Sequence, residues 1–182
     1  MKRCIILASG PSLDDEDIDV CRKSRWSIIT INNTWARYPD CDIIYGGDYI
    51  WWKEHHKLIK SNAEFWSCNQ HASLSFNLNH HQVPPGTYNS GMRAIELAVK
   101  LGAEHVILLG YDCSLSHGSH WHGNHDTTAN PTDELITLWK QHFSHVAKKL
   151  NHKVNIVNCS RFTELDVFRR ASLCDTLASV SQ

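Results

Sequence analysis

Short, continuous apolar runs are the feature that most constrains how this chain can fold. They lie at residues 4–8, 27–31, 41–45, 105–109 and 153–157, with a weaker run at residues 64–67. Runs of this length without polar alternation are typical of strands in a parallel sheet that is covered on both faces. Parallel strands need long crossover connections, which are usually helices, so the pattern predicts an α/β fold.

Helical patterns separate these runs. The predicted helices are residues 49–60, 91–101, 130–150 and 161–171. The second carries apolar residues at helical spacing and stops at Gly102, which suits a left-handed C-cap. The third starts at Asn130 and Pro131, a capping side chain followed by proline in the first turn. Residues after Leu173 are small and polar, and we expect a loosely held tail.

The whole chain, residues 1–182, is expected to form one three-layer Rossmann-like domain with a mostly parallel sheet between helices. Its net charge is −1 and it has no basic stripe, which argues against a nucleic-acid partner. Seven cysteines without a Cys-x-x-Cys pair indicate a reducing compartment. No apolar run approaches the ~20 residues of a membrane span. We therefore expect a cytoplasmic protein; the sequence leaves a homo-oligomer open.

Ligands of an open parallel sheet bind beyond the carboxyl ends of its strands, so the residues that follow each strand are candidates. After the first two strands these are Ser9, Gly10, Pro11, Ser12, Asn32 and Asn33. Gly10 allows close backbone approach, and free N–H groups around it would favour a phosphate. The asparagine amides suit a base or ribose edge. A tight strand-to-helix turn and an Asx turn are the simpler readings of these two segments.

The later strand ends add further candidates. They are Asp48 after the third strand, Asn89, Ser90 and Gly91 at a helix start, and Asp112 and Ser114 after the fourth main strand. Asn89 or Ser90 would cap the helix, whose N-terminus offers an anion site. Asp48 and Asp112 are carboxylates of the kind that hold Mg²⁺ or a ribose.

Two long connections, residues 69–85 and 114–130, are expected to be functional loops, because structureless loops of that length are uncommon. The second is rich in histidine and contains His117, His120, His122 and His125. Histidine suits proton transfer at neutral pH, yet several imidazoles together could also hold Zn²⁺, with Asp112 nearby. A polar loop that merely tolerates histidine is the third reading. The histidines elsewhere that we assign to solvated faces or loops are His55, His56, His80, His81, His142, His145 and His152.

The order of these motifs carries a resemblance. It runs from the GPSL turn through Asn-Asn, Asn-Ser-Gly and LLGYD to the histidine loop and the stretch NCSRFTELDVF. In this order the chain resembles the bacterial lipooligosaccharide sialyltransferases, and it is similar to the related 6-hydroxymethylpterin diphosphokinase-like (MptE-like) proteins. The resemblance spans residues 1–170.

The resemblance implies roles for single residues. It places the turn from Ser9 to Leu13 beside the nucleotide phosphate and Asn32 against the donor nucleotide. The segment that begins at Asn89 would hold the cytidine part or the sugar. His125 would be the base that deprotonates a hydroxyl-bearing acceptor, in a reaction that requires no metal or other cofactor.

The chain also departs from the sialyltransferase pattern. Two tyrosines that grip the leaving phosphate are replaced by Ser114 and, approximately, His120; His120 or His122 would donate hydrogen bonds in their place. The third strand ends in Asp48 where that family has an asparagine. The resemblance therefore implies a nucleotide-activated, CMP-sialic-acid-type donor scaffold without fixing the sugar.

Two alternatives stay open at this point. One is a Mg²⁺-dependent diphosphate transferase of the pterin branch, in which Asp48 and Asp112 hold the metal. The other is a non-catalytic nucleotide-binding module.

Overall fold

A computed structural model describes residues 1–86, 88–123, 130–150 and 152–180. Its strands form a single sheet in the order β5-β4-β3-β2-β1-β6-β7-β8, and every pairing is parallel, which confirms the predicted α/β sheet. The strands are β1 (Arg3–Leu7), β2 (Ser27–Ile31), β3 (Ile43–Tyr45), β4 (Glu64–Ser67), β5 (Asn79–His80), β6 (His105–Leu109), β7 (Asn155–Asn158) and β8 (Arg169–Arg170).

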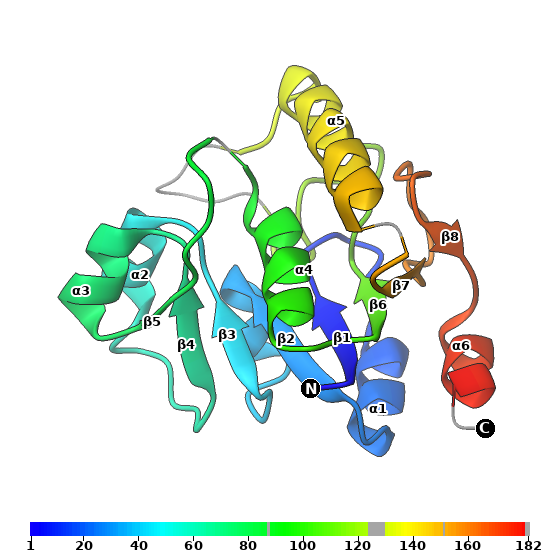
Figure 1. Cartoon of the computed structure of the whole chain (residues 1–182), viewed down its shortest axis with the longest axis horizontal. Coiled ribbons are helices and arrows are strands. Elements are labelled where there is room, and N and C mark those ends of the chain that lie inside the picture. The colour runs from blue at the N-terminus through cyan, green and yellow to red at the C-terminus, as the bar shows by residue number, and fades with distance from the viewer. Residues whose placement is uncertain (87, 124–129, 151, 181–182) are drawn as a thin grey trace.

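Helices cover both faces of the sheet (Figure 1). They are α1 (Asp15–Lys23), α2 (Tyr49–His55), α3 (Gln70–Phe76), α4 (Ser90–Lys100), α5 (Asp133–Leu150) and α6 (Leu173–Val180), with a 3-10 helix η1 (Asn32–Ala36). Alternate residues of β1 face the two helical layers. Cys4 and Ile6 pack with α4 and α5, whereas Ile5 and Leu7 pack with α1, α2 and α6. Because both faces are buried, the strands are apolar throughout.

The chain changes direction across the sheet at β1. Strands β2 to β5 extend from one side of β1, and β6 to β8 extend from the other. In Figure 1 the central strands point toward the sheet edge above which α5 lies. A reversal of strand order creates a crevice at the carboxyl ends of the two strands involved, here β1 and β6.

The loops that leave β1 and β6 pack closely against each other. The Gly10 N–H donates to the Gly110 carbonyl at 3.0 Å, and a Cβ on Gly10 would come within 2.4 Å of that oxygen. Gly110 has φ +70°, and a Cβ there would come within 2.5 Å of the Ala8 carbonyl oxygen. Both positions therefore require glycine, which fixes the spacing of the two loops.

Several predicted elements are wrong or incomplete. Residues 161–171 do not form a helix, because Thr163 and Glu164 use their polar groups to bond the carbonyls that follow β6. The expected loose tail is instead α6, which Ser172 caps and Leu173 anchors in the core. The connection at residues 69–85 contains α3 and β5, and the helix predicted to reach residue 60 ends at His55.

Sequence reasoning sets no bounds for helix α1 beyond a strand-to-helix turn, although both ends of the helix carry clear signals. Asp14 accepts hydrogen bonds from the Glu16 and Asp17 N–H groups, and the helix ends in Arg22 and Lys23. Acidic residues in the first turn and basic residues in the last complement the helix dipole. Because the helix is short and has no long apolar stripe, its bounds were not predicted from hydrophobic periodicity.

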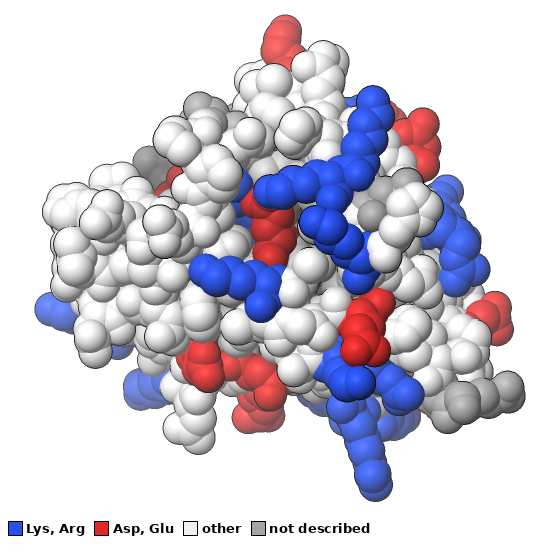
Figure 2. All heavy atoms as spheres, in the orientation of Figure 1, with Lys and Arg blue, Asp and Glu red and all other residues white. Residues whose placement is uncertain are grey.

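Charges of both signs are interspersed on the face shown in Figure 2. One cluster joins α4 to α5: Glu96 accepts from Arg93 at 2.7 Å and from Lys149 at 2.9 Å. Among the described residues, no helix combines the length and the apolar character that crossing a bilayer requires.

Substituting Gly110 tests the packing of the two loops. We expect Gly110→Ala to lower the free energy of unfolding by about 2–4 kcal/mol, through left-handed strain plus the clash with Ala8. Gly123→Ala is the matched control, because Gly123 also has a positive φ, +83°, but no atom of the described residues lies within 4 Å of an added Cβ. Urea denaturation of both variants measures the difference, and equal stabilities would contradict this packing.

Candidate active site at the β1 and β6 strand ends

A cavity of about 670 Å³ opens at the carboxyl ends of the central strands. Its floor comes from the segments after β1, β2 and β6, and its sides come from the N-termini of α2 and α4 and from α5. The candidates that line it are Ser9, Gly10, Asn32, Asp48, Asn89, Ser90, Gly91, Asp112, Ser114 and His120. Fold and sequence therefore bring most of the predicted site residues to one place.

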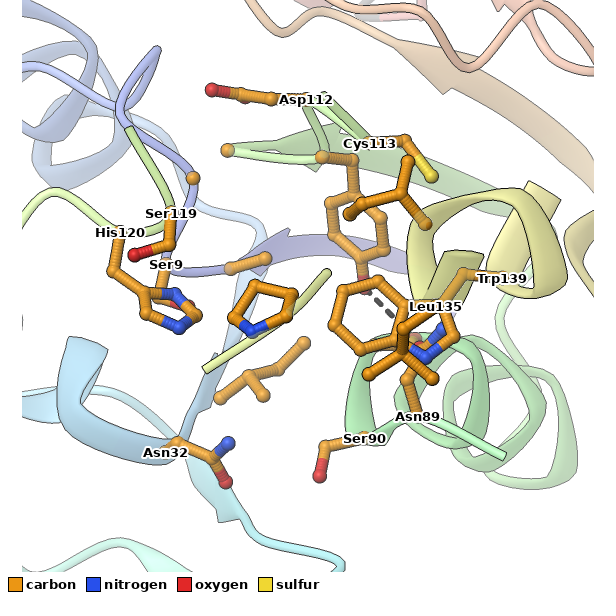
Figure 3. Close-up of a pocket in the computed structure, with 18 of the residues that line it drawn as sticks. Ser9, Asn32, Asn89, Ser90, Asp112, Cys113, Ser119, His120, Leu135 and Trp139 are labelled. Carbon is orange, nitrogen blue, oxygen red and sulfur yellow. Dashed lines mark hydrogen bonds between the residues drawn. The ribbon is translucent and has the colours of Figure 1, made fainter. Parts of the chain in front are cut away.

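Asp112 clamps the first loop to the end of β6. Its two carboxylate oxygens accept from the Ser12 N–H, at 2.8 Å, and from the Ser12 hydroxyl. Its side chain points away from the other labelled residues in Figure 3 and is 3% exposed. Burial raises the pKa of this carboxyl to about 6, and the Ser12 hydrogen bonds oppose the shift. Asp112 thus positions the loop rather than facing a ligand.

Most N–H groups of the first loop, which were predicted to be free for a phosphate, donate hydrogen bonds within the protein. Gly10 donates to Gly110, Ser12 donates to Asp112, and the Leu13 N–H donates to the Gly10 carbonyl at 3.1 Å. Pro11 has no N–H. This loop therefore lacks the cradle of amides that phosphate loops use, and its remaining polar contribution to the cavity is Ser9.

Ser9 joins the histidine loop to β1. The Ser9 hydroxyl lies 2.9 Å from His120 Nδ1, and the Trp121 N–H donates to the Ser9 carbonyl at 2.8 Å. The Arg37 guanidinium lies over the Trp121 ring, with its Cζ 5.1 Å from the ring centroid. Figure 3 shows Ser9, Ser119 and His120 grouped on one side of the cavity. A hydroxyl and an imidazole are thus paired at the site.

The other loop histidines are placed differently. His117 stacks on Phe162 with centroids 4.1 Å apart, and His122 stacks on His120 at 5.0 Å. His125 lies outside the described residues. Within the described ranges, no three His, Cys, Asp or Glu side chains are grouped so that they could hold a metal ion.

The start of α4 forms a second side of the cavity. Asn89 caps the helix, with Oδ1 accepting from the Met92 N–H at 2.7 Å. The Ser90 hydroxyl accepts from the Gly47 N–H at 3.0 Å, and a Cβ on Gly91 would lie 3.2 Å from the Tyr111 ring. Of the two predicted caps, Asn89 and Ser90, the structure shows Asn89 as the N-cap. The helix dipole makes this end favourable for negative charge.

The two adjacent asparagines have separate surroundings. Asn33 Oδ1 accepts from Trp51 Nε1 at 2.7 Å, which ties η1 to α2. Asn32 has φ +47°, in the left-handed region, and its buried Oδ1 has no partner among the described residues. Asn32 lines the cavity and Asn33 does not. Backbone strain combined with an unsatisfied polar atom is typical of a binding residue.

Asp48 and Ser114 line the cavity from different segments. Asp48 is the N-terminal flank of α2. The Ser114 hydroxyl donates to Glu164 at 2.7 Å, and Glu164 also pairs with Lys140. Ser114 is thus engaged by the surface network beside the cavity.

Sequence reasoning missed the wall that α5 contributes. The α5 side chains that line the cavity are Leu135, Ile136, Leu138, Trp139, His142 and Phe143. His142 was assigned to a solvated face, which is wrong because it is half-buried and lines the cavity. His81 received the same assignment, but it is buried, with Nδ1 3.2 Å from the Tyr45 hydroxyl. The α5 residues recur at helical spacing, but periodicity alone does not say which part of an apolar face lines a cavity.

No lysine or arginine is among the described residues that line the cavity. An anion bound there would be held by hydroxyl groups, amides, histidine and the α4 N-terminus. Such a donor set suits a single negative charge better than a triphosphate.

No protein-family model matches the chain, and no curated protein sequence matches it at a significant level. Among solved structures, the fold is similar to that of a MAf glycosyltransferase from Magnetospirillum magneticum AMB-1. The TM-score is 0.67 and the sequence identity 16%, and the match covers 94% of this chain and 34% of that one. The chain thus spans about a third of that protein's length, and the likeness is one of fold.

The buried Asp112 carboxyl predicts a pH-dependent stability. Its pKa is raised to about 6 in the folded protein from 3.8, so the folded state binds this proton more tightly than the unfolded chain does. Its contribution to stability is therefore greatest below pH ~4 and falls by roughly 3 kcal/mol as pH rises to about 6. We expect Asp112→Asn to lack this component. Urea denaturation of both proteins at several pH values measures it, and parallel curves would contradict the assignment.

Proposed function

We propose that this protein is a glycosyltransferase that uses a nucleotide-activated sugar of the CMP-sialic-acid type as donor. The observation that carries the proposal is the cavity at the β1 and β6 strand ends, where open α/β folds bind nucleotides. The motif order shared with lipooligosaccharide sialyltransferases supports the reaction type. The fold likeness to a MAf glycosyltransferase is consistent with it.

The cavity suggests how the donor is arranged. The phosphate would lie between Ser9, His120 and the N-terminus of α4, since these supply the polar donors around the floor. Asn32 and Asn89 would contact the nucleoside or the sugar. A CMP-sugar carries one phosphate, which suits a site without lysine or arginine.

His125 is proposed as the general base. It follows the loop that Ser9 and Trp121 anchor at the cavity, four residues after Trp121 in the chain. The base would remove the acceptor hydroxyl proton while the nucleotide departs, and His120 or His122 would donate to the leaving phosphate. This mechanism requires no cofactor.

The Mg²⁺-dependent diphosphate transferase is less well supported. It needs Asp48 and Asp112 to share a cation with a triphosphate, but Ser12 occupies both carboxylate oxygens of Asp112. The described residues that line the cavity also include no lysine or arginine to balance the charge of a triphosphate. Donor turnover that stops on chelation would favour this alternative.

Replacing His125 tests the reaction. We expect His125→Ala to reduce the hydrolysis of CMP-N-acetylneuraminate, with water as acceptor, by about 10²–10⁴-fold, because general-base catalysis is lost. CMP should still raise the thermal melting temperature, since the base does not hold the nucleotide. The exposed His145 on α5 supplies the control His145→Ala, which should keep wild-type turnover.

The readout is CMP release followed by chromatography. Full activity in His125→Ala would contradict the base assignment. Tight CMP binding without turnover of any CMP-sugar by the wild-type protein would favour a non-catalytic binding module.

A further inference from the structure

Unsatisfied polar atoms are concentrated at the cavity. Among the described residues, the buried side-chain nitrogen or oxygen atoms without a hydrogen-bond partner belong to Asn32, Asn89, His105 and His142. Three of these four residues line the cavity. Buried polar groups in native proteins are almost always paired, so a cluster of exceptions around one cavity indicates a ligand that pairs with them.

The orientation of the Asn89 amide is fixed by the fold. Its Oδ1 accepts from the Met92 N–H at the start of α4, so the amide cannot be flipped without losing the cap. Its Nδ2 is therefore the atom for which the described ranges provide no partner. An amide nitrogen is a donor, and it requires an acceptor oxygen or nitrogen on the ligand.

His142 supplies the second polar atom at the same end of the cavity. Its ring packs edge-on against Tyr88, the residue before Asn89, with centroids 4.9 Å apart, and its Nδ1 has no hydrogen-bond partner within the part of the chain that the structure describes. Burial, together with Arg93 and His145, lowers the pKa of His142, so the imidazole is neutral at pH 7. Arg93 itself lies 4.0 Å from the Tyr88 ring and pairs with Glu96. A neutral imidazole both donates and accepts, which suits an uncharged partner.

The α5 wall on this side of the cavity presents apolar side chains beside Asn89. Leu135, Trp139 and His142 recur at helical spacing along the α5 wall, and Figure 3 shows Asn89, Leu135 and Trp139 on the same side of the cavity. A flat group that rests on leucine and tryptophan would turn its polar edge toward Asn89 and His142. A planar amide has this combination of an apolar face and an edge with both donor and acceptor.

We propose that His142 and Asn89 are specificity-determining residues that hydrogen-bond a planar amide group of the donor against the α5 wall. The inference rests on the proposed use of a nucleotide-activated sugar and names the group by which that donor is selected. Two parts of such a donor carry a planar amide: the edge of the pyrimidine base and an N-acyl group on the sugar.

Two substitutions remove the polar atoms and keep the packing. His142→Phe keeps a ring against Tyr88 and loses both nitrogens. Asn89→Asp keeps the helix cap, since aspartate is an equally good N-cap, but replaces the donor with an acceptor oxygen. His145→Phe makes the same change as the first variant at an exposed position of α5 and serves as the control.

The test is calorimetric titration of these proteins with four probes: CMP, CMP-N-acetylneuraminate, its deaminated analogue that has a hydroxyl in place of the N-acyl group, and ribose 5-phosphate. We expect both site variants to bind an amide-bearing probe about 10-fold more weakly than wild type, because one hydrogen bond is lost. Ribose 5-phosphate should bind all proteins equally, and the control should match wild type.

The probes distinguish the two sources of the amide. If the variants already bind CMP more weakly than wild type does, the pyrimidine base lies at His142. If only the affinity for CMP-N-acetylneuraminate falls, the N-acyl group lies there. Both results support the proposal. Unchanged affinity of His142→Phe and Asn89→Asp for every probe that wild type binds would overturn it. If wild type binds none of the nucleotide probes, the proposed function itself fails, and the inference falls with it.

Discussion

The close packing of the loops that follow β1 and β6 is the constraint on which the rest of the site depends. Gly10 and Gly110 allow the two backbones to touch, and the Asp112 carboxylate holds Ser12 against the end of β6. This arrangement engages the Gly10 and Ser12 N–H groups, and it directs the carboxylate of Asp112 to Ser12. Ser9 is then the residue of this loop whose side chain meets the histidine loop, through His120.

The walls of the resulting cavity differ in polarity. Strand ends and the α4 N-terminus supply hydroxyls and amides, whereas α5 supplies leucine and tryptophan. Because the described lining contains no lysine or arginine, charge attraction contributes little, and recognition depends on hydrogen bonds made in a partly apolar space. Such a site would select its ligand by shape and by hydrogen-bond pattern more than by total charge.

The sequence predicted the sheet well because each buried strand is a continuous apolar run, and it located the strand-end residues because parallel strands share one edge. Three features escaped prediction for physical reasons. The use of the Ser12 and Gly10 N–H groups depends on contact with Asp112 and Gly110, about a hundred residues away in the chain. His142 reads as a surface residue until the position of α5 is known. The apolar residues within 161–171 recur at helical spacing, but Thr163 and Glu164 donate hydrogen bonds to the carbonyls that follow β6, and these tertiary contacts prevent a helix.

The most direct test of the central claim, that this cavity is a nucleotide site, is a crystal structure of the protein with CMP in the absence of metal ions. The account predicts CMP at the β1 and β6 strand ends, with its phosphate near Ser9 and His120 and its nucleoside against Asn32 or the Asn89 end of the cavity. CMP bound elsewhere, or an unoccupied cavity at saturating CMP, would contradict it.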